Sequence, residues 1–258
     1  MVGTERAVLF DLHDTLVHLV PSTEEALAAA LGVPVADYRV AWHAIDERIE
    51  QGSWTPTTDD RWTDLYRPLV NDLGLLFSPE EVAARFSDLF RSTDSYVAFS
   101  DVAHALRGLV ETGFRLGVLS NSDFPLEPIL EGCGIGGFIF SAVPAVSHGT
   151  TKPYPEAFLL GTDALGVRPQ GCWFVGDRLI DDVTASAALG MKPVLVDRTG
   201  RYASASLPFP RIPDLSLLQA IIEQLPERRA VQEQEALLSG EVAHRSPRTS
   251  MPDASSRS

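Results

Sequence analysis

Three apolar runs in this chain each end on polar or acidic side chains whose chemistry could serve a binding or catalytic site. One run ends at Asp11, a second at Ser120, and a third leads through Gly176 to Asp177. Short apolar runs of this kind predict buried strands, and the carboxyl ends of parallel strands open into the crevice where α/β proteins bind ligands. Carboxylate oxygens gathered there are suitable ligands for Mg²⁺. Considered singly, each of these residues also fits a turn or a helix cap.

The stretch over residues 7–17 resembles the first motif of the haloacid dehalogenase superfamily. That motif is an apolar strand followed by Asp-x-Asp and then Gly-Thr or Asp-Thr, and this chain has Asp11, His13 and Thr15 at the matching positions. The resemblance implies that Asp11 attacks phosphorus and becomes an aspartyl phosphate, and that Thr15 lies at the substrate. The family's second aspartate transfers protons, and His13 stands in its place.

An imidazole at residue 13 could still perform acid–base catalysis, because its ordinary pKa lies near neutrality. We expect nearby carboxylates to favour the charged form of His13, which donates a proton readily and accepts one poorly. Phosphoryl transfer to Asp11 is then less impaired than hydrolysis of the acyl phosphate, and Asp14 is the alternative base. The backbone carbonyl of His13 is implied as a metal ligand, which the substitution need not disturb.

Two further segments resemble the second and third motifs of the family. Ser120 and Asn121 follow a predicted strand, where the family's Ser or Thr donates a hydrogen bond to the transferring phosphoryl group and Asn121 would be its companion at the substrate. Residues 151–158 match the pattern Lys-Pro-x-Pro-x-x-Phe, whose lysine separates the charges of the nucleophile and the phosphate. Lys152 is one of only two lysines in the chain, the other being Lys192.

A glycine and a cluster of aspartates after the third apolar run resemble the fourth motif of the family. Gly176 and Asp177 are followed by Asp181 and Asp182. The resemblance implies a Mg²⁺ site in which Asp11 and Asp177 supply the two carboxylates. Asp182 aligns best with the family's supporting acid, and Asp181 is the second choice. A helix cap explains one carboxylate but not this whole arrangement.

The elements around these motifs predict an α/β protein with a Rossmann-like, doubly wound parallel sheet and an inserted all-helical cap domain. The strands that lead to Asp11, Ser120 and Asp177 should be neighbours. Predicted strands cover residues 7–10, 114–119, 138–140, 172–175 and 193–196, and the last helix covers residues 214–225.

Residues 18–98 carry four amphipathic helical segments and no convincing strand, which resembles the C1-type cap of subfamily I. We therefore expect residues 1–17 and 99–226 to form the core domain, and residues 227–258 to form a helical extension and a disordered tail. In the family this cap closes over the site and selects the substrate. Trp54, which lies in a polar break between helices, is the best candidate for a cap residue at the substrate.

Composition limits the partners of this 258-residue chain. Its formal net charge of −14 and pI of about 4.8 argue against nucleic acid and against anionic membrane surfaces. Cys133 and Cys172 are isolated and suggest neither a disulfide framework nor a metal site. With no leader peptide evident, and no apolar run of about 18 residues, we expect a cytoplasmic protein that is monomeric or homodimeric.

The function that these motifs predict is a Mg²⁺-dependent phosphatase acting on a small phosphorylated metabolite. Family dehalogenases also lack the second aspartate, but they attack carbon without Mg²⁺ and their fourth motif departs from Gly-Asp, so Gly176 and Asp177 favour phosphorus. Phosphonate cleavage needs a cap lysine, and residues 18–98 contain none. The remaining alternative is a member without turnover that binds a phosphorylated ligand or a partner protein.

Overall fold

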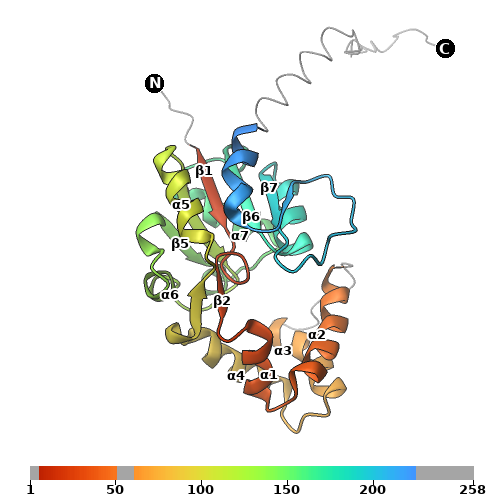
Figure 1. Ribbon diagram of the computed structural model, residues 1–258. Helices are drawn as coiled ribbons and strands as arrows, with labels where there is room; N and C mark the ends of the chain where they lie inside the picture. The colour runs from red at the N-terminus through yellow and green to blue at the C-terminus, as the bar shows by residue number, and fades with distance from the viewer. Residues whose placement is uncertain (1–5, 51–60, 225–258) are drawn as a thin grey trace, which may run out of the picture. The chain divides into compact units, whose positions relative to one another are not determined.

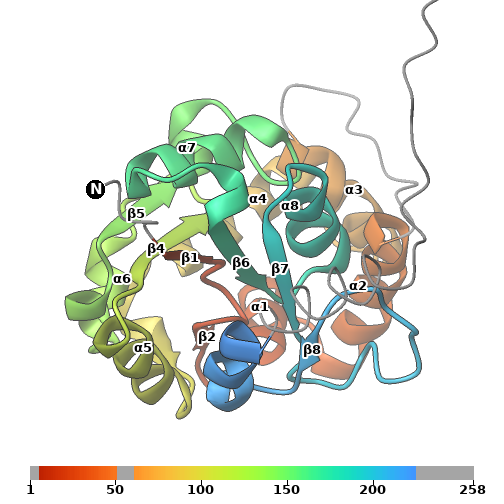
Figure 2. The same cartoon turned by 90° about the horizontal axis from the view of Figure 1, so that it is seen from above.

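The computed structural model describes residues 6–50 and 61–224. Within these ranges a parallel sheet carries six strands in the order β5-β4-β1-β6-β7-β8 (Figures 1 and 2). The strands are β1 (Ala7–Phe10), β4 (Arg115–Ser120), β5 (Ser141–Pro144), β6 (Cys172–Gly176), β7 (Lys192–Val196) and β8 (Arg211–Ile212). This is the predicted Rossmann-like α/β core.

The central strand β1 is buried along its whole length and lies between β4 and β6. Phe10 at its end is level with Val118 on one side and with Val175 on the other. Because the three strands run in the same direction, the residues that follow them leave the sheet at one edge. The prediction that these three strands are neighbours is confirmed.

Helices cover both faces of the sheet, as a doubly wound fold requires. Figure 2 shows α7 (Pro155–Leu165) and α8 (Ala185–Ala188) on one side and α5 (Val102–Glu111) on the other. A glycine allows α7 to approach the sheet, because a Cβ at Gly161 would lie 2.5 Å from a methyl carbon of Leu9. The α7 face therefore packs directly against the strand that leads to Asp11.

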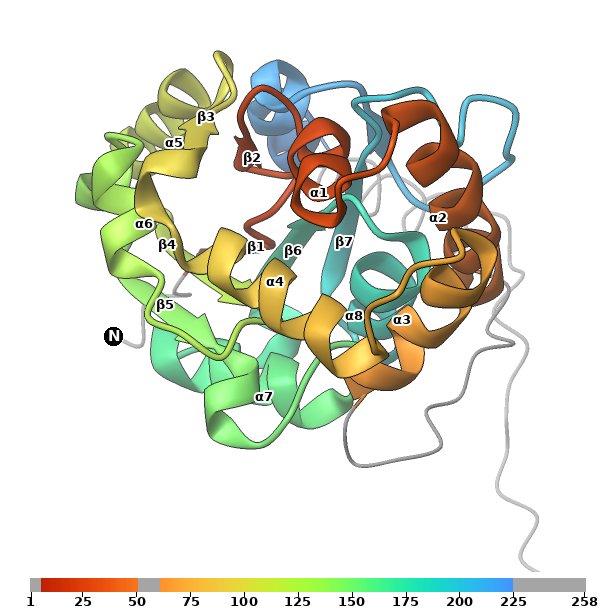
Figure 3. The ribbon, with the colours of Figure 1, turned by 90° about the horizontal axis from the view of Figure 1, so that it is seen from below.

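The structure describes four α-helices between residues 20 and 95, and Figure 3 shows them from below. They are α1 (Thr23–Leu31), α2 (Val35–Glu50), α3 (Arg61–Asp72) and α4 (Pro79–Arg91). They share one hydrophobic cluster, to which Leu27, Tyr38, Leu69 and Phe86 each contribute from a different helix. Ser78 caps α4, its hydroxyl accepting a hydrogen bond from the backbone N–H of Glu81.

The prediction that residues 18–98 contain no strand was wrong. Strands β2 (Val17–Leu19) and β3 (Tyr96–Ala98) pair antiparallel at the two ends of the helical insertion. Each has only three residues, which is too few for an alternating pattern, and each needs a partner that is remote in the sequence. This short ribbon joins the helices to the sheet.

Two other element boundaries differ from prediction. The strand predicted over residues 138–140 is replaced by a 3₁₀ turn, Gly136–Phe138, and β5 begins at Ser141, because a short apolar triplet does not distinguish a strand from a turn. The last helix begins as a 3₁₀ turn, Leu215–Leu217, and residues 218–224 are helical. The predicted extension and tail over residues 227–258 lie outside the described residues.

By internal contacts the chain divides into two units, residues 1–219 and residues 220–258. Of the second unit the structure describes residues 220–224, which are helical. The proposed boundaries between core and cap, at residues 17/18 and 98/99, lie within the first unit. The division itself stays a prediction. Among the described residues, no helix is both long enough and apolar enough to cross a membrane.

Candidate active site

A buried lysine holds two carboxylates together at the sheet edge. The Nζ atom of Lys152 lies 2.5 Å from Oδ1 of Asp11 and 2.7 Å from Oδ1 of Asp182, and all three side chains are buried. Burial alone would lower the pKa of Lys152, but the charges and hydrogen bonds of Asp11 and Asp182 outweigh burial and raise it. The lysine is therefore a permanent cation between two acids.

A third carboxylate completes an acidic cluster that could hold a metal ion. Oxygen atoms of Asp11, Asp177 and Asp182 lie within 4.8 Å of one another. Burial, and then the negative charges of Asp11 and Asp182, raise the pKa of Asp177 well above its ordinary value. Thr15 donates a long hydrogen bond of 3.4 Å to Asp177, whereas Asp181 is not part of the cluster. Three close oxygen donors with one lysine suit a hard divalent cation.

His13 lies beside this cluster with both ring nitrogens in contact. Its Nε2 is 2.9 Å from the Tyr96 hydroxyl, and its Nδ1 is 3.4 Å from the Ser120 hydroxyl. The ring of Phe90 packs edge-on against the imidazole at 5.3 Å. Burial and then the charge of Lys152 lower the pKa of His13 to about 4. The expectation that carboxylates favour a charged His13 was wrong, because burial of the ring, and then the charge of Lys152, disfavour the protonated form.

Ser120 and Asn121 leave β4 in different directions. The Ser120 hydroxyl is buried and lies 2.8 Å from the hydroxyl of Ser122, on the side of His13. Asn121 binds the backbone of Lys152 twice, donating to its carbonyl at 3.0 Å and accepting from its N–H at 2.7 Å. The described contacts of Asn121 thus position the lysine loop, while the hydroxyl of Ser120 lies between His13 and Ser122.

Gly176 allows Asp182 to reach the lysine. A Cβ at residue 176 would lie 2.5 Å from Cγ and 2.7 Å from Cβ of Asp182. From its place against this glycine, Asp182 binds Lys152 and accepts a 3.0 Å hydrogen bond from the backbone N–H of Arg178. The absence of a side chain at residue 176 therefore sets the position of a carboxylate in the cluster.

We expect Gly176→Ala to displace Asp182, to destabilise the protein by ~1–3 kcal/mol, and to reduce turnover, because the added methyl group cannot share the space of that carboxylate. Denaturant unfolding and turnover measure the two effects. Gly137→Ala is the matched control, since a Cβ there would meet nothing within 4 Å. Equal stability and turnover in the two variants would contradict this account of Gly176.

The side chain of Asp14, the alternative base, is bonded to Thr23, the first residue of α1. The backbone of Asp14 is left-handed, with φ 58°, and its Oδ1 accepts a hydrogen bond of 2.9 Å from Thr23. Burial is the largest influence on the carboxyl and raises the pKa of Asp14. The side chain is thus engaged with the helical segment.

Sequence reasoning missed several residues around the site. Tyr96 begins β3 and contacts His13, although nothing in its sequence neighbourhood indicates this. Asp46 of α2 is buried and accepts hydrogen bonds from both Arg178 and Arg201. The position of Arg178 directly after Asp177 was the available signal for that pair. Trp54, predicted at the substrate, lies outside the described residues.

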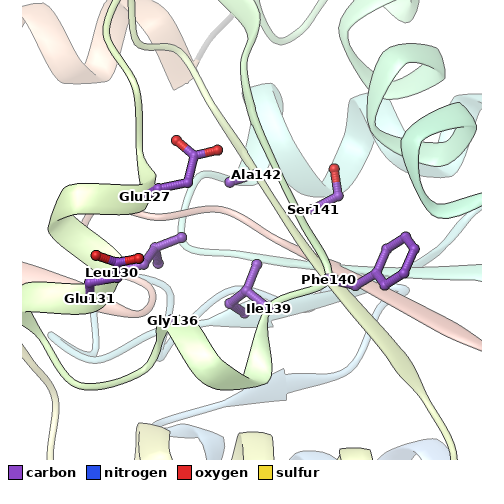
Figure 4. Close-up of a pocket in the computed structure, with 8 residues that line it drawn as sticks. All are labelled: Glu127, Leu130, Glu131, Gly136, Ile139, Phe140, Ser141 and Ala142. Carbon is purple, nitrogen blue, oxygen red and sulfur yellow. The ribbon is translucent and has the colours of Figure 1, made fainter.

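A separate cavity lies between α6 (Glu127–Gly132) and β5 (Figure 4). It has a volume of about 400 Å³. The side chains of Glu127, Glu131 and Phe140 are among those that line it, and no residue of the acidic cluster does. This cavity is therefore distinct from the candidate active site.

The fold and the acidic cluster together define a hydrolase of one known class. A family profile described as haloacid dehalogenase-like hydrolase matches residues 5–190 of the chain. The chain therefore belongs to the haloacid dehalogenase-like hydrolases.

Several curated relatives are named phosphatases, among them the following two. The chain is 31% identical over 208 residues to the glyceraldehyde 3-phosphate phosphatase of Methanopyrus kandleri, covering 76% of this chain and 85% of the relative. It is 30% identical over 217 residues to the phosphoglycolate phosphatase of Escherichia coli, covering 78% and 84%. A solved L-2-haloacid dehalogenase from Xanthobacter autotrophicus superposes with a TM-score of 0.59 at 19% identity, covering 85% and 98%. That likeness concerns the fold alone.

Proposed function

We propose that this hydrolase is a Mg²⁺-dependent phosphatase of a small phosphorylated metabolite, with Asp11 as the nucleophile. The observation that carries the proposal is the ammonium of Lys152 between Asp11 and Asp182, beside the third carboxylate of Asp177. The relatives named as phosphatases of glyceraldehyde 3-phosphate and phosphoglycolate support a small phosphorylated substrate. The net charge of −14 supports such a ligand over nucleic acid.

Asp11, Asp177 and the backbone carbonyl of His13 would hold the Mg²⁺ ion. When bound, the ion would offset negative charge on the phosphoryl oxygens. Burial, and then the charges of the nearby carboxylates, raise the pKa of Asp177, so a divalent cation would relieve repulsion among ligands that already lie close together. The donor set, composed of oxygen atoms, is of the kind that Mg²⁺ prefers.

The reaction takes two steps at Asp11. A carboxylate oxygen of Asp11 forms a bond to phosphorus while the bond to the leaving oxygen breaks, and water then cleaves the resulting acyl phosphate to restore the carboxylate. Lys152 binds Asp11 and, with the hydroxyl of Ser120, stabilises charge on the phosphoryl oxygens. His13 accepts the proton of the attacking water. Asp182 acts through Lys152, which it holds in place.

Residues 18–98 are proposed to act as the cap that selects the substrate. Support comes from the contact between Asp46 on α2 and Arg178, the residue after Asp177. Arg201 binds the same carboxylate from another loop. Through Asp46 the helical segment is bonded directly to the chain that carries the acidic cluster.

Phosphate release from a panel of phosphorylated metabolites tests the proposed function. The panel includes glyceraldehyde 3-phosphate, phosphoglycolate and alkyl and aryl phosphates, and we expect release that requires Mg²⁺, stops with a chelator and returns when Mg²⁺ is restored. Metal-independent release of halide from 2-haloacids would overturn the proposal in favour of a dehalogenase. Phosphate analogues that bind without any turnover of the panel would overturn it in favour of a binding protein.

A further inference from the structure

The hydroxyl of Tyr96 has one proton, and the structure assigns that proton to a backbone carbonyl. Tyr96 donates a hydrogen bond of 3.0 Å to the carbonyl oxygen of Phe90, near the end of α4. The same hydroxyl lies 2.9 Å from Nε2 of His13. Since a hydroxyl donates only once, the hydrogen bond to Phe90 leaves His13 a lone pair of the Tyr96 oxygen, an arrangement that matches Nε2 as the donor.

The other nitrogen of the ring faces the reacting groups. Nδ1 of His13 is 3.4 Å from the hydroxyl of Ser120, at the edge of the sheet where Asp11 lies. The edge-on contact with Phe90, with rings inclined at 70°, limits rotation of the imidazole. Because Nε2 is hydrogen-bonded to Tyr96, Nδ1 is the ring nitrogen that can exchange a proton with a ligand or with water.

We propose that Tyr96 is a positioning residue that holds Nε2 of His13 as a hydrogen-bond donor and leaves the lone pair of Nδ1 directed to Ser120 at the sheet edge. This inference rests on the proposed function for its role in turnover, although the hydrogen-bond arrangement stands by itself. It concerns His13, the residue at which this chain departs from the motif that it resembles.

In the second step, the oxygen of the attacking water bonds to phosphorus and the bond between phosphorus and the Asp11 oxygen breaks. One proton of that water passes to the lone pair of Nδ1, and the electron pair of the broken bond returns to the Asp11 carboxylate. His13 then carries hydrogen on both nitrogens and afterwards releases the Nδ1 proton to solvent. Nε2 keeps its hydrogen bond to Tyr96 throughout.

Nitrogen-15 NMR of the histidine-labelled protein tests the arrangement without any substrate. Two-bond couplings identify which nitrogen of a neutral imidazole carries hydrogen, and a His13→Gln variant assigns the signal. We expect the natural chain to carry hydrogen on Nε2. Hydrogen on Nδ1 would overturn the inference, whatever the activity of the protein and whether or not any Tyr96 variant folds.

The Tyr96→Phe variant supplies the kinetic test. We expect it to lose the single tautomer and to lower kcat by ~10-fold or more with little change in KM, since proton transfer is impaired while binding is not. Tyr38→Phe is the control, because the Tyr38 hydroxyl is also buried and has no hydrogen-bond partner within residues 6–50 and 61–224. Unchanged kcat and tautomer in Tyr96→Phe would overturn the inference. No phosphate release by the natural chain would instead refute the proposed function, and the NMR result would still decide the tautomer.

Discussion

We expect the Asp11→Asn variant to release phosphate at least ~10⁴-fold more slowly than the natural chain, which is the scale of loss seen when a covalent nucleophile is removed. The amide has nearly the same shape as the carboxylate but lacks the negative charge needed to attack phosphorus. It also removes one of the two acids that Lys152 bridges. Initial rates of phosphate release with saturating Mg²⁺ measure the effect.

The control for this variant is Asp163→Asn, which makes the same chemical change at an exposed position on α7. We expect it to keep the rate of the natural chain. Trapping of radiolabelled phosphate on the protein by acid quench should succeed with the control and fail with Asp11→Asn. An Asp11→Asn protein that is folded and turns over at the natural rate would refute the role of this carboxylate.

The second large effect is expected for Lys152→Met, which should both abolish most turnover and destabilise the protein. Removing one partner of a buried ion pair costs ~3–5 kcal/mol, because the remaining charges are left in a poorly solvated site. Here the loss leaves three carboxylates within 4.8 Å of one another and no lysine between them. Urea unfolding without metal measures the change in the free energy of unfolding.

Lys192→Met is the natural comparison, because Lys192 is the only other lysine in the chain. Lys192 begins β7, and its ammonium lies 5.5 Å from the ring centre of Trp173 in β6. We expect its replacement to cost about 1 kcal/mol or less, which is the usual size of such a cation–π contact. Similar stability losses in the two lysine variants would show that Lys152 has no special position among the carboxylates.

The part of the site that the sequence predicts is the part built from strand ends. Apolar runs that stop at Asp11, Ser120 and Asp177 predict buried strands with chemistry at one edge, and parallel pairing brings those ends together. Lys152 was predicted from its motif and lies between Asp11 and Asp182. These residues could be anticipated because the pattern along the chain and the geometry of a parallel sheet agree.

What the sequence did not predict depends on contacts between remote segments. The ribbon of β2 and β3 is too short to have a pattern of its own, and the contact of Tyr96 with His13 exists only because that ribbon forms. The protonation state of His13 was misjudged for a related reason. The sequence shows the carboxylates that lie near His13 along the chain. Burial of His13 and its proximity to Lys152 arise only when the chain folds.

The antiparallel ribbon also makes the helical insertion a replaceable module. Val17 pairs with Ala98 and Leu19 with Tyr96, so the chain leaves and re-enters the sheet domain at adjacent points. A foreign segment with closely spaced ends could therefore be grafted between residues 19 and 96 without breaking any ladder of the six-stranded sheet. If the helices select the substrate as proposed, such chimaeras are expected to exchange selectivity between relatives while retaining the chemistry, provided that the donor segment supplies a carbonyl for Tyr96 in place of that of Phe90 and its own acid for Arg178 and Arg201.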